Sequence, residues 1–179
     1  MDFASHYLED ARTVARIYKG LADGAIAQVD DEQFAASLGD EENSIALIIK
    51  HMAGNLRSRW TDFFTTDGEK PDRDRDSEFE LTGTDDRAAL LEAWEAGWAT
   101  FLGVLDGLTP ADFDRPVTIR GEPYTVLRAV ERGVAHACYH VGQIVLLAKH
   151  FAGPEWRTLS IPRRQSQAFN ADMAAKQGR

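Results

Sequence analysis

The chain has 179 residues, of which 44% are hydrophobic and 27% are charged, which is usual for one globular domain with a buried core. Its formal net charge of −9 argues against nucleic acid as a partner, because a phosphate backbone would be repelled by most of the surface. The longest apolar run, residues 144–148, is far too short to cross a bilayer, so we expect no membrane partner.

The first expected helix runs from about Phe3 to Val29, because apolar residues recur there at helical spacing. The N-terminus is acidic and lacks the basic and then apolar pattern of a secretory signal. The single cysteine, Cys138, excludes an internal disulfide and suits a reducing compartment. We therefore expect a cytoplasmic protein.

Residues 30–42 are acidic and indicate a connection to a second helix. That helix begins near Asn43 or Ser44, since either side chain can cap a helix N-terminus. Its apolar residues recur at helical spacing as far as Trp60, and we expect it to end around Thr65.

The polar segment over residues 67–84 is expected to include a short extended piece at Glu78–Leu81. Residues 84–86 then open a third helix, whose apolar stripe reaches Leu108. Residues 109–112 predict a short extra helical turn, because a capping threonine precedes a proline at the first helical position.

A small strand at residues 117–119 and a turn at residues 120–123 precede the fourth helix, which is expected to run from about Thr125 to Phe151. Four long helices predict an all-α fold, a four-helix bundle with a short strand or hairpin before the last long helix. We expect one domain over residues 1–179, with residues 154–179 as a C-terminal tail or lid.

Three histidines on two of these helices form the candidate metal site. His136 and His140 are four residues apart on the fourth helix, so their rings share one face, and His51 lies on the second helix. If the two helices pack side by side, the three imidazoles converge. Three neutral imidazoles can hold a divalent metal and leave a coordination position open, as in reactive rather than structural sites.

Helical spacing places Asn55 on the face of His51 and Gln143 on the face of His140. Either amide can orient an imidazole or hold a water molecule at the metal. The alternative is that each inward histidine is a core residue bonded to a carbonyl group. No carboxylate offers a clear fourth ligand, since Glu131 lies five residues before His136 and on a different side.

Several arginines are candidates for binding a substrate carboxylate or phosphate: Arg57, Arg59, Arg120 and Arg163. The alternative for each is ion pairing with the surplus of acidic side chains. Arg120 is the strongest candidate, because it lies in the turn before the fourth helix. The segment around Arg163 can fold over the end of the helices as a lid.

Long phrases of the chain resemble the DinB-like superfamily, which includes the YfiT-like proteins, and in particular a subfamily without an assigned reaction. These phrases are NSIALIIKHMAGNLRSRWTDFFTTDGEKPDRDRD, IRGEPYTVLRAV, AHACYHVGQIVLLAKH and TLSIPRRQS. The resemblance implies a four-helix bundle, with His51, His136 and His140 as metal ligands, and often a homodimer.

The leading hypothesis is a metal-dependent enzyme that activates water or a low-molecular-weight thiol for attack on a small electrophile, by thiol transfer or hydrolysis. Zinc is the first choice of metal, and nickel, iron or manganese can also accept imidazole ligands. Substrate and any thiol cosubstrate are small molecules. A second hypothesis is a non-catalytic metal-binding or ligand-binding homodimer linked to a stress response. The third is a structural helical scaffold.

Overall fold

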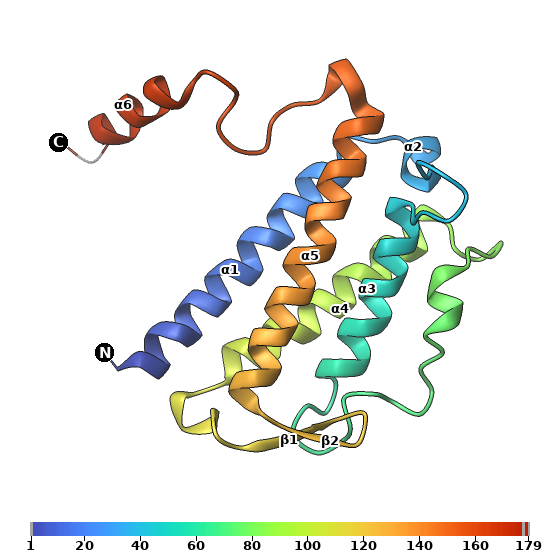
Figure 1. Ribbon diagram of the computed structural model, residues 1–179, viewed down its shortest axis with the longest axis vertical. Coiled ribbons are helices and arrows are strands. Elements are labelled where there is room, and N and C mark those ends of the chain that lie inside the picture. The colour runs from blue at the N-terminus through green and yellow to red at the C-terminus, as the bar shows by residue number, and fades with distance from the viewer. Residues whose placement is uncertain (1, 177, 179) are drawn as a thin grey trace.

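The computed structural model describes residues 2–176 and residue 178, and Figure 1 shows the long helices beside a small hairpin. The helices and strands, in chain order, are α1 (Phe3–Ile26), α2 (Asp31–Ala35), α3 (Ile45–Trp60), the 3₁₀ helix η1 (Asp76–Phe79), α4 (Arg87–Gly107), η2 (Pro110–Asp112), β1 (Pro116–Ile119), β2 (Glu122–Thr125), α5 (Val126–Ala152), η3 (Gly153–Glu155) and α6 (Ser166–Lys176). The prediction of a mostly helical chain with a hairpin before the last long helix is confirmed.

The four long helices pack around one apolar core. Helix α1 contacts α4 and α5, and α3 contacts the same two helices. The largest fully buried side chains are Trp94, Trp98 and Phe101 of α4, with leucine, isoleucine, valine and methionine side chains of all four long helices. This packing places α3 beside α5, as the convergence of the histidines requires.

The ends of α3 show which boundary signals the sequence carries. The Ser44 hydroxyl accepts a hydrogen bond from the Leu47 N–H, so the helix begins where the capping residue predicts. It ends at Trp60 rather than around Thr65, because Asp62 adopts a left-handed backbone with φ of 48°. Aspartate tolerates that conformation better than most residues, and the chain turns there.

Two short helices lie where a connection and an extended piece were expected. In α2, Asp30 and Gln33 form a reciprocal capping box, and Phe34 is buried. The expected extended piece, Glu78–Leu81, is wrong in its first half, where residues 78 and 79 belong to η1, whereas Glu80 is extended. The first turn of η1 is held by the Asp74 carboxylate, which accepts two backbone N–H groups. This turn directs Glu78 inward, where its side chain is buried.

The hairpin of β1 and β2 is joined by Arg120 and Gly121, with φ values of 56° and 74°. Positive φ at both central residues gives the turn a twist that matches the strands. The Asp67 carboxylate accepts hydrogen bonds from both of their backbone N–H groups, each at 2.8 Å. The segment after α3 therefore holds the hairpin beside the C-terminal end of that helix.

The segment after α5 follows α1 before reaching α6. Gln28 exchanges two hydrogen bonds with the backbone of Arg157, and the Leu159 side chain lies against Gly24. Figure 1 shows α6 extending away from the four long helices, and none of its residues is buried. Among the described residues, no helix combines the length and apolar character needed to cross a membrane.

Candidate metal centre

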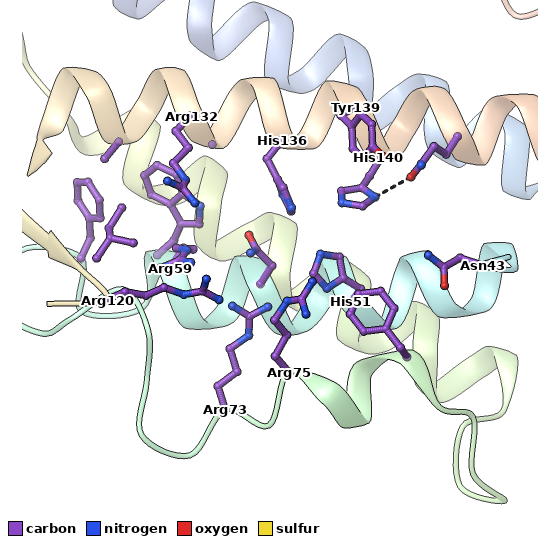
Figure 2. A pocket seen from close by; sticks show the side chains of 18 residues that line it. Asn43, His51, Arg59, Arg73, Arg75, Arg120, Arg132, His136, Tyr139 and His140 are labelled. Atoms are coloured by element: carbon purple, nitrogen blue, oxygen red, sulfur yellow. Dashed lines mark hydrogen bonds between the residues drawn. The ribbon is translucent and has the colours of Figure 1, made fainter. Parts of the chain in front are cut away.

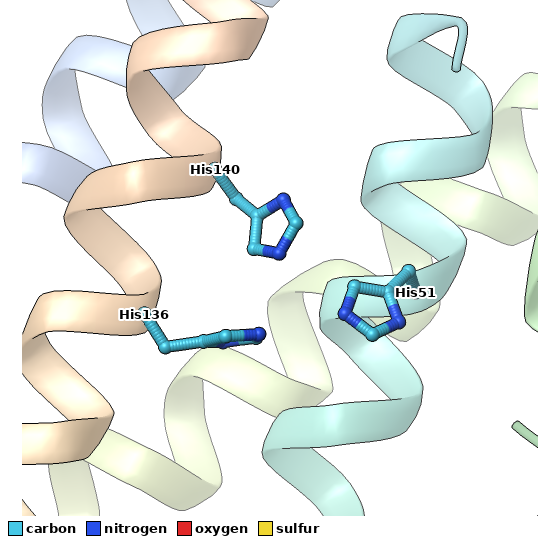
Figure 3. A group of neighbouring side chains, drawn as sticks. All are labelled: His51, His136 and His140. Atoms are coloured by element: carbon cyan, nitrogen blue, oxygen red, sulfur yellow. The ribbon is translucent and has the colours of Figure 1, made fainter. Parts of the chain in front are cut away.

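Three histidines from α3 and α5 face one another across the space between these helices. Figure 3 shows the rings of His136 and His140, one turn apart on α5, directed toward His51 on α3. One ring nitrogen of each lies within 4.8 Å of one nitrogen of each of the others. His51 and His140 are only 4% and 8% exposed. The structure thus brings together the three residues that the spacing singled out.

The separation of these nitrogens is close to what a metal would need. Ligands at about 2.0–2.1 Å from a tetrahedral metal lie about 3.4 Å apart. Small ring rotations would therefore complete a three-imidazole site. The three histidines fit a divalent metal, and the open side of the cluster leaves room for a fourth ligand.

Hydrogen bonds on the far side of two rings fix which nitrogen is available. His51 Nδ1 lies 2.9 Å from a carboxylate oxygen of Glu78, and His140 Nδ1 lies 2.9 Å from the side-chain oxygen of Gln143. Both oxygens accept, so each Nδ1 is the donor in its hydrogen bond, which leaves Nε2 as the ring nitrogen available to a metal. This is the arrangement by which proteins orient metal-binding imidazoles.

Glu78 is itself held by a bidentate pair with Arg73, at 2.8 and 2.9 Å. Burial raises the pKa of the Glu78 carboxyl, but the hydrogen bonds from His51 and Arg73 outweigh it and hold this pKa below the ordinary value. The carboxylate is therefore charged at neutral pH and acts on His51 rather than as a fourth ligand. The Phe79 ring stacks on His51, with ring centroids 4.8 Å apart, and covers it.

Two glycines make room for the side chains around the cluster. A Cβ at position 54, three residues after His51, would overlap the Glu78 carboxylate. A Cβ at position 133, three residues before His136, would overlap the indole of Trp60. Both helices therefore need glycine at these positions, one for the hydrogen bond to His51 and one for the close approach of α3 to α5.

Burial keeps the histidines of α5 neutral. Loss of solvation, together with the charges of the neighbouring imidazoles, lowers the pKa of His136 to about 3 and that of His140 to about 4. Protonation would place positive charges side by side in a partly buried space, so it is disfavoured. At neutral pH both rings keep the lone pair that a metal requires.

The histidines form one end of a pocket of about 400 Å³. Figure 2 shows the remainder of its wall, where arginines from α3, the segment after α3, the hairpin and α5 extend toward the space beside His136. These arginines are Arg59, Arg73, Arg75, Arg120 and Arg132. Among the described residues that line the pocket, none is acidic, although the chain as a whole carries a net charge of −9.

The structure separates the candidate substrate-binding arginines into two groups. Arg59 and Arg120 line the pocket, whereas Arg57 pairs with Asp72 at 3.0 Å on an exposed surface. Arg163 lies in the exposed segment before α6 and does not line the pocket. Of the two candidate amides, Gln143 binds His140 as described, and Asn55 lines the pocket one turn after His51.

Sequence reasoning missed Glu78, Arg73, Arg75 and Arg132. Glu78, Arg73 and Arg75 lie in the polar segment after α3, where charged residues follow no helical or strand spacing that would predict which side chains point inward. One signal was present: Gly54 follows His51 by three residues and leaves that face of α3 open to a side chain from elsewhere.

A family model described as "Protein of unknown function (DUF1572)" matches residues 2–165, a range that includes all three histidines and every arginine of the pocket. No curated protein and no solved structure matches the chain.

Proposed function

The chain belongs to the DUF1572 family, and we propose that it is a metal-dependent enzyme in which His51, His136 and His140 hold a divalent metal at the end of the pocket. The reaction class is thiol transfer to, or hydrolysis of, a small electrophile. The observation that carries this proposal is the convergence of three imidazoles on a pocket, two of them oriented by hydrogen bonds through Nδ1.

The metal would supply a Lewis acid that lowers the pKa of a water or thiol. The chain's own groups prepare that site. Glu78 and Gln143 fix the tautomers of His51 and His140, and Phe79 shields the His51 ring from solvent. We place zinc first, with nickel, iron or manganese as alternatives, because imidazole nitrogen suits all of them.

The resemblance to the DinB-like superfamily extends the proposal to the whole chain. We interpret α1, α3, α4 and α5 as the four-helix bundle of that superfamily, in one domain with residues 154–179 as a tail or lid. We also propose a cytoplasmic homodimer. Tyr139 and Leu146, two turns apart on α5, are 64% and 65% exposed and offer an apolar face for a second copy. Light scattering of the purified protein tests the dimer.

A non-catalytic alternative keeps the same site. Among the described residues that line the pocket, there is no carboxylate, cysteine, serine or lysine to act as general base or nucleophile. This composition favours a metal-binding or ligand-binding homodimer, linked to a stress response, if no turnover exists. The two functions share the metal and differ only in whether a bound electrophile is consumed.

Turnover measurements on metal-loaded protein test the enzymatic proposal. Protein reconstituted with Zn²⁺, Ni²⁺, Fe²⁺ or Mn²⁺ would be given chlorodinitrobenzene and nitrophenyl esters, with and without cysteine or glutathione. We expect one metal to support turnover that chelation abolishes and that the His136→Ala variant lacks. If every loaded form binds its metal stoichiometrically yet shows no rate above free metal, the enzymatic proposal is wrong and the binding function remains.

A further inference from the structure

Positive charge is concentrated at one end of the pocket without matching negative charge. Five guanidinium groups line the wall. Among the described residues, the salt bridges of these five within 4.0 Å involve only two carboxylates, Glu69 and Glu78. Glu69 lies 3.2 Å from each of Arg59, Arg73 and Arg120, so a single charge serves three cations.

Nearby acidic groups do not correct this imbalance. Asp67 is close, but its carboxylate accepts backbone N–H groups from Glu69, Arg120 and Gly121, which fixes the hairpin instead of pairing a side chain. Glu78 binds Arg73 on one side and His51 on the other. Arg132 donates to the Tyr124 hydroxyl and Arg75 stacks on Phe79, so these contacts bring neither guanidinium a negative charge.

Arg59 shows most directly that a partner is missing. Its side chain is 10% exposed, and its Nη1 is buried without a hydrogen-bond partner among the described residues. Burial lowers the pKa of this guanidinium, as do the charges of Arg73, Arg120 and Arg132, against the attraction of Glu69. A buried donor of this kind is costly unless a ligand satisfies it.

We propose that the arginine end of the pocket binds a small ligand that carries two negative charges on its oxygens, either a phosphomonoester or a dicarboxylate. Guanidinium groups suit both, because their paired N–H groups match carboxylate and phosphate oxygens. An anion there would compensate the excess charge and place the rest of the ligand toward the histidines. Only this last point, which part of the ligand reacts, rests on the proposed metal-dependent function.

Calorimetric titration of the full chain tests the inference with defined probes. Inorganic phosphate and succinate would be titrated into chelated protein and into zinc-loaded protein, beside acetate and succinamide as singly charged and neutral controls. We expect phosphate, succinate or both to bind in the absence of metal, more tightly than acetate by about tenfold or more, and succinamide not to bind. Binding of phosphate but not succinate would indicate a phosphomonoester as the ligand, and the reverse would indicate a dicarboxylate.

Matched variants locate the binding site. Arg132→Gln changes an exposed pocket residue, so folding is not at stake, and Arg57→Gln changes an exposed arginine outside the pocket. Arg132→Gln is expected to weaken dianion binding by about tenfold to a hundredfold, and Arg57→Gln to leave it within about twofold. The Arg59→Gln variant should show the larger loss, provided that circular dichroism reports an intact fold.

The outcomes separate this inference from the metal proposal. Dianion binding that needs metal and is equal in Arg132→Gln and the unchanged chain would place the anion on the metal and overturn the inference. Absence of dianion binding in protein that retains zinc would also overturn it. Dianion binding in a protein that takes up no divalent metal on reconstitution would leave the inference standing and remove the proposed enzyme.

Discussion

The two ends of the pocket are built in different ways. At one end, three imidazoles come from two helices, and Glu78 and Gln143 hold the Nδ1 atoms of His51 and His140. At the other end, five charged side chains come from four different parts of the chain, and one buried donor, Arg59 Nη1, has no partner among the residues that the structure describes. The first end is prepared for a cation and the second for an anion.

This difference shows how sequence encodes each site. Helical periodicity alone places His136 and His140 on one face, so the cation end depends on local geometry and one helix contact. The anion end exists only because the segment after α3 folds back along the helix and the hairpin is fixed by Asp67. Replacing a single histidine should therefore abolish binding at the cation end, whereas changes in the packing of the segment after α3 should weaken binding at the anion end.

The largest expected effect is loss of metal on replacing one histidine. Protein purified without an affinity tag or chelator should retain about one metal per chain, and His136→Ala should retain almost none, because two remaining imidazoles hold a metal far more weakly. His150→Ala, two residues from the C-terminal end of the same helix and exposed, is the matched control. Elemental analysis gives the ratio. Equal metal content in the two variants would exclude the three-histidine site.

The next effect concerns the link between the two ends. Gly54→Ala should displace the Glu78 carboxylate, separate it from His51 and Arg73, and destabilise the fold by about 2–4 kcal/mol. Gly142→Ala, on α5 with no atom within 4 Å of the added Cβ, should stabilise it by up to about 1 kcal/mol. Urea denaturation monitored by circular dichroism measures both changes. If Gly54→Ala left the free energy of unfolding unchanged, the contacts of Glu78 with His51 and Arg73 would not stabilise the fold.

Glu78 also marks where prediction from sequence stopped. The capping candidates Asn43 and Ser44, and residues 84–86, predicted where α3 and α4 begin, because a cap is a local signal; the observed caps are Ser44 and Asp86. The partner of His51 lies 27 residues away in a polar segment, and its approach depends on η1 and on the space above Gly54. Contacts of that kind are decided by packing over long sequence separations, which periodicity and capping do not report.

The pH dependence of the metal-free protein tests the neutral character of the cation end. The pKa values of His136 and His140 lie at about 3 and about 4 in the folded chain, against 6.5 for an ordinary histidine. Below pH 6.5 the unfolded chain therefore binds more protons, and the free energy of unfolding should fall as the pH decreases toward 4. After allowance for solvent screening, we expect a loss of about 2 kcal/mol between pH 6.5 and 5.

Replacing one of these rings should reduce that loss. His136→Gln removes one group with a lowered pKa, so about half of the pH dependence should disappear, whereas His150→Gln should leave it unchanged. Chemical denaturation of chelated protein at each pH gives the free energies. A curve that is flat between pH 6.5 and 5 would mean that these rings titrate in the folded chain as they do in the unfolded chain.

The smallest effect is expected for an exposed ion pair, Arg57 with Asp72, compared with the buried pair of Arg73 and Glu78. Arg57 and Asp72 form a pair at 3.0 Å with side chains 55% and 67% exposed, whereas the side chains of Arg73 and Glu78 are 2% and 7% exposed. Exposed pairs are weakened by water and salt, so a double-mutant cycle on Arg57 and Asp72 should give a coupling of at most about 0.5 kcal/mol. The same cycle on Arg73 and Glu78 should give a larger coupling, because each single change leaves a buried charge without its partner. Similar couplings for the two pairs would mean that the loop carrying Arg73 opens readily, and the arginine end of the pocket would then lack the fixed wall on which anion binding depends.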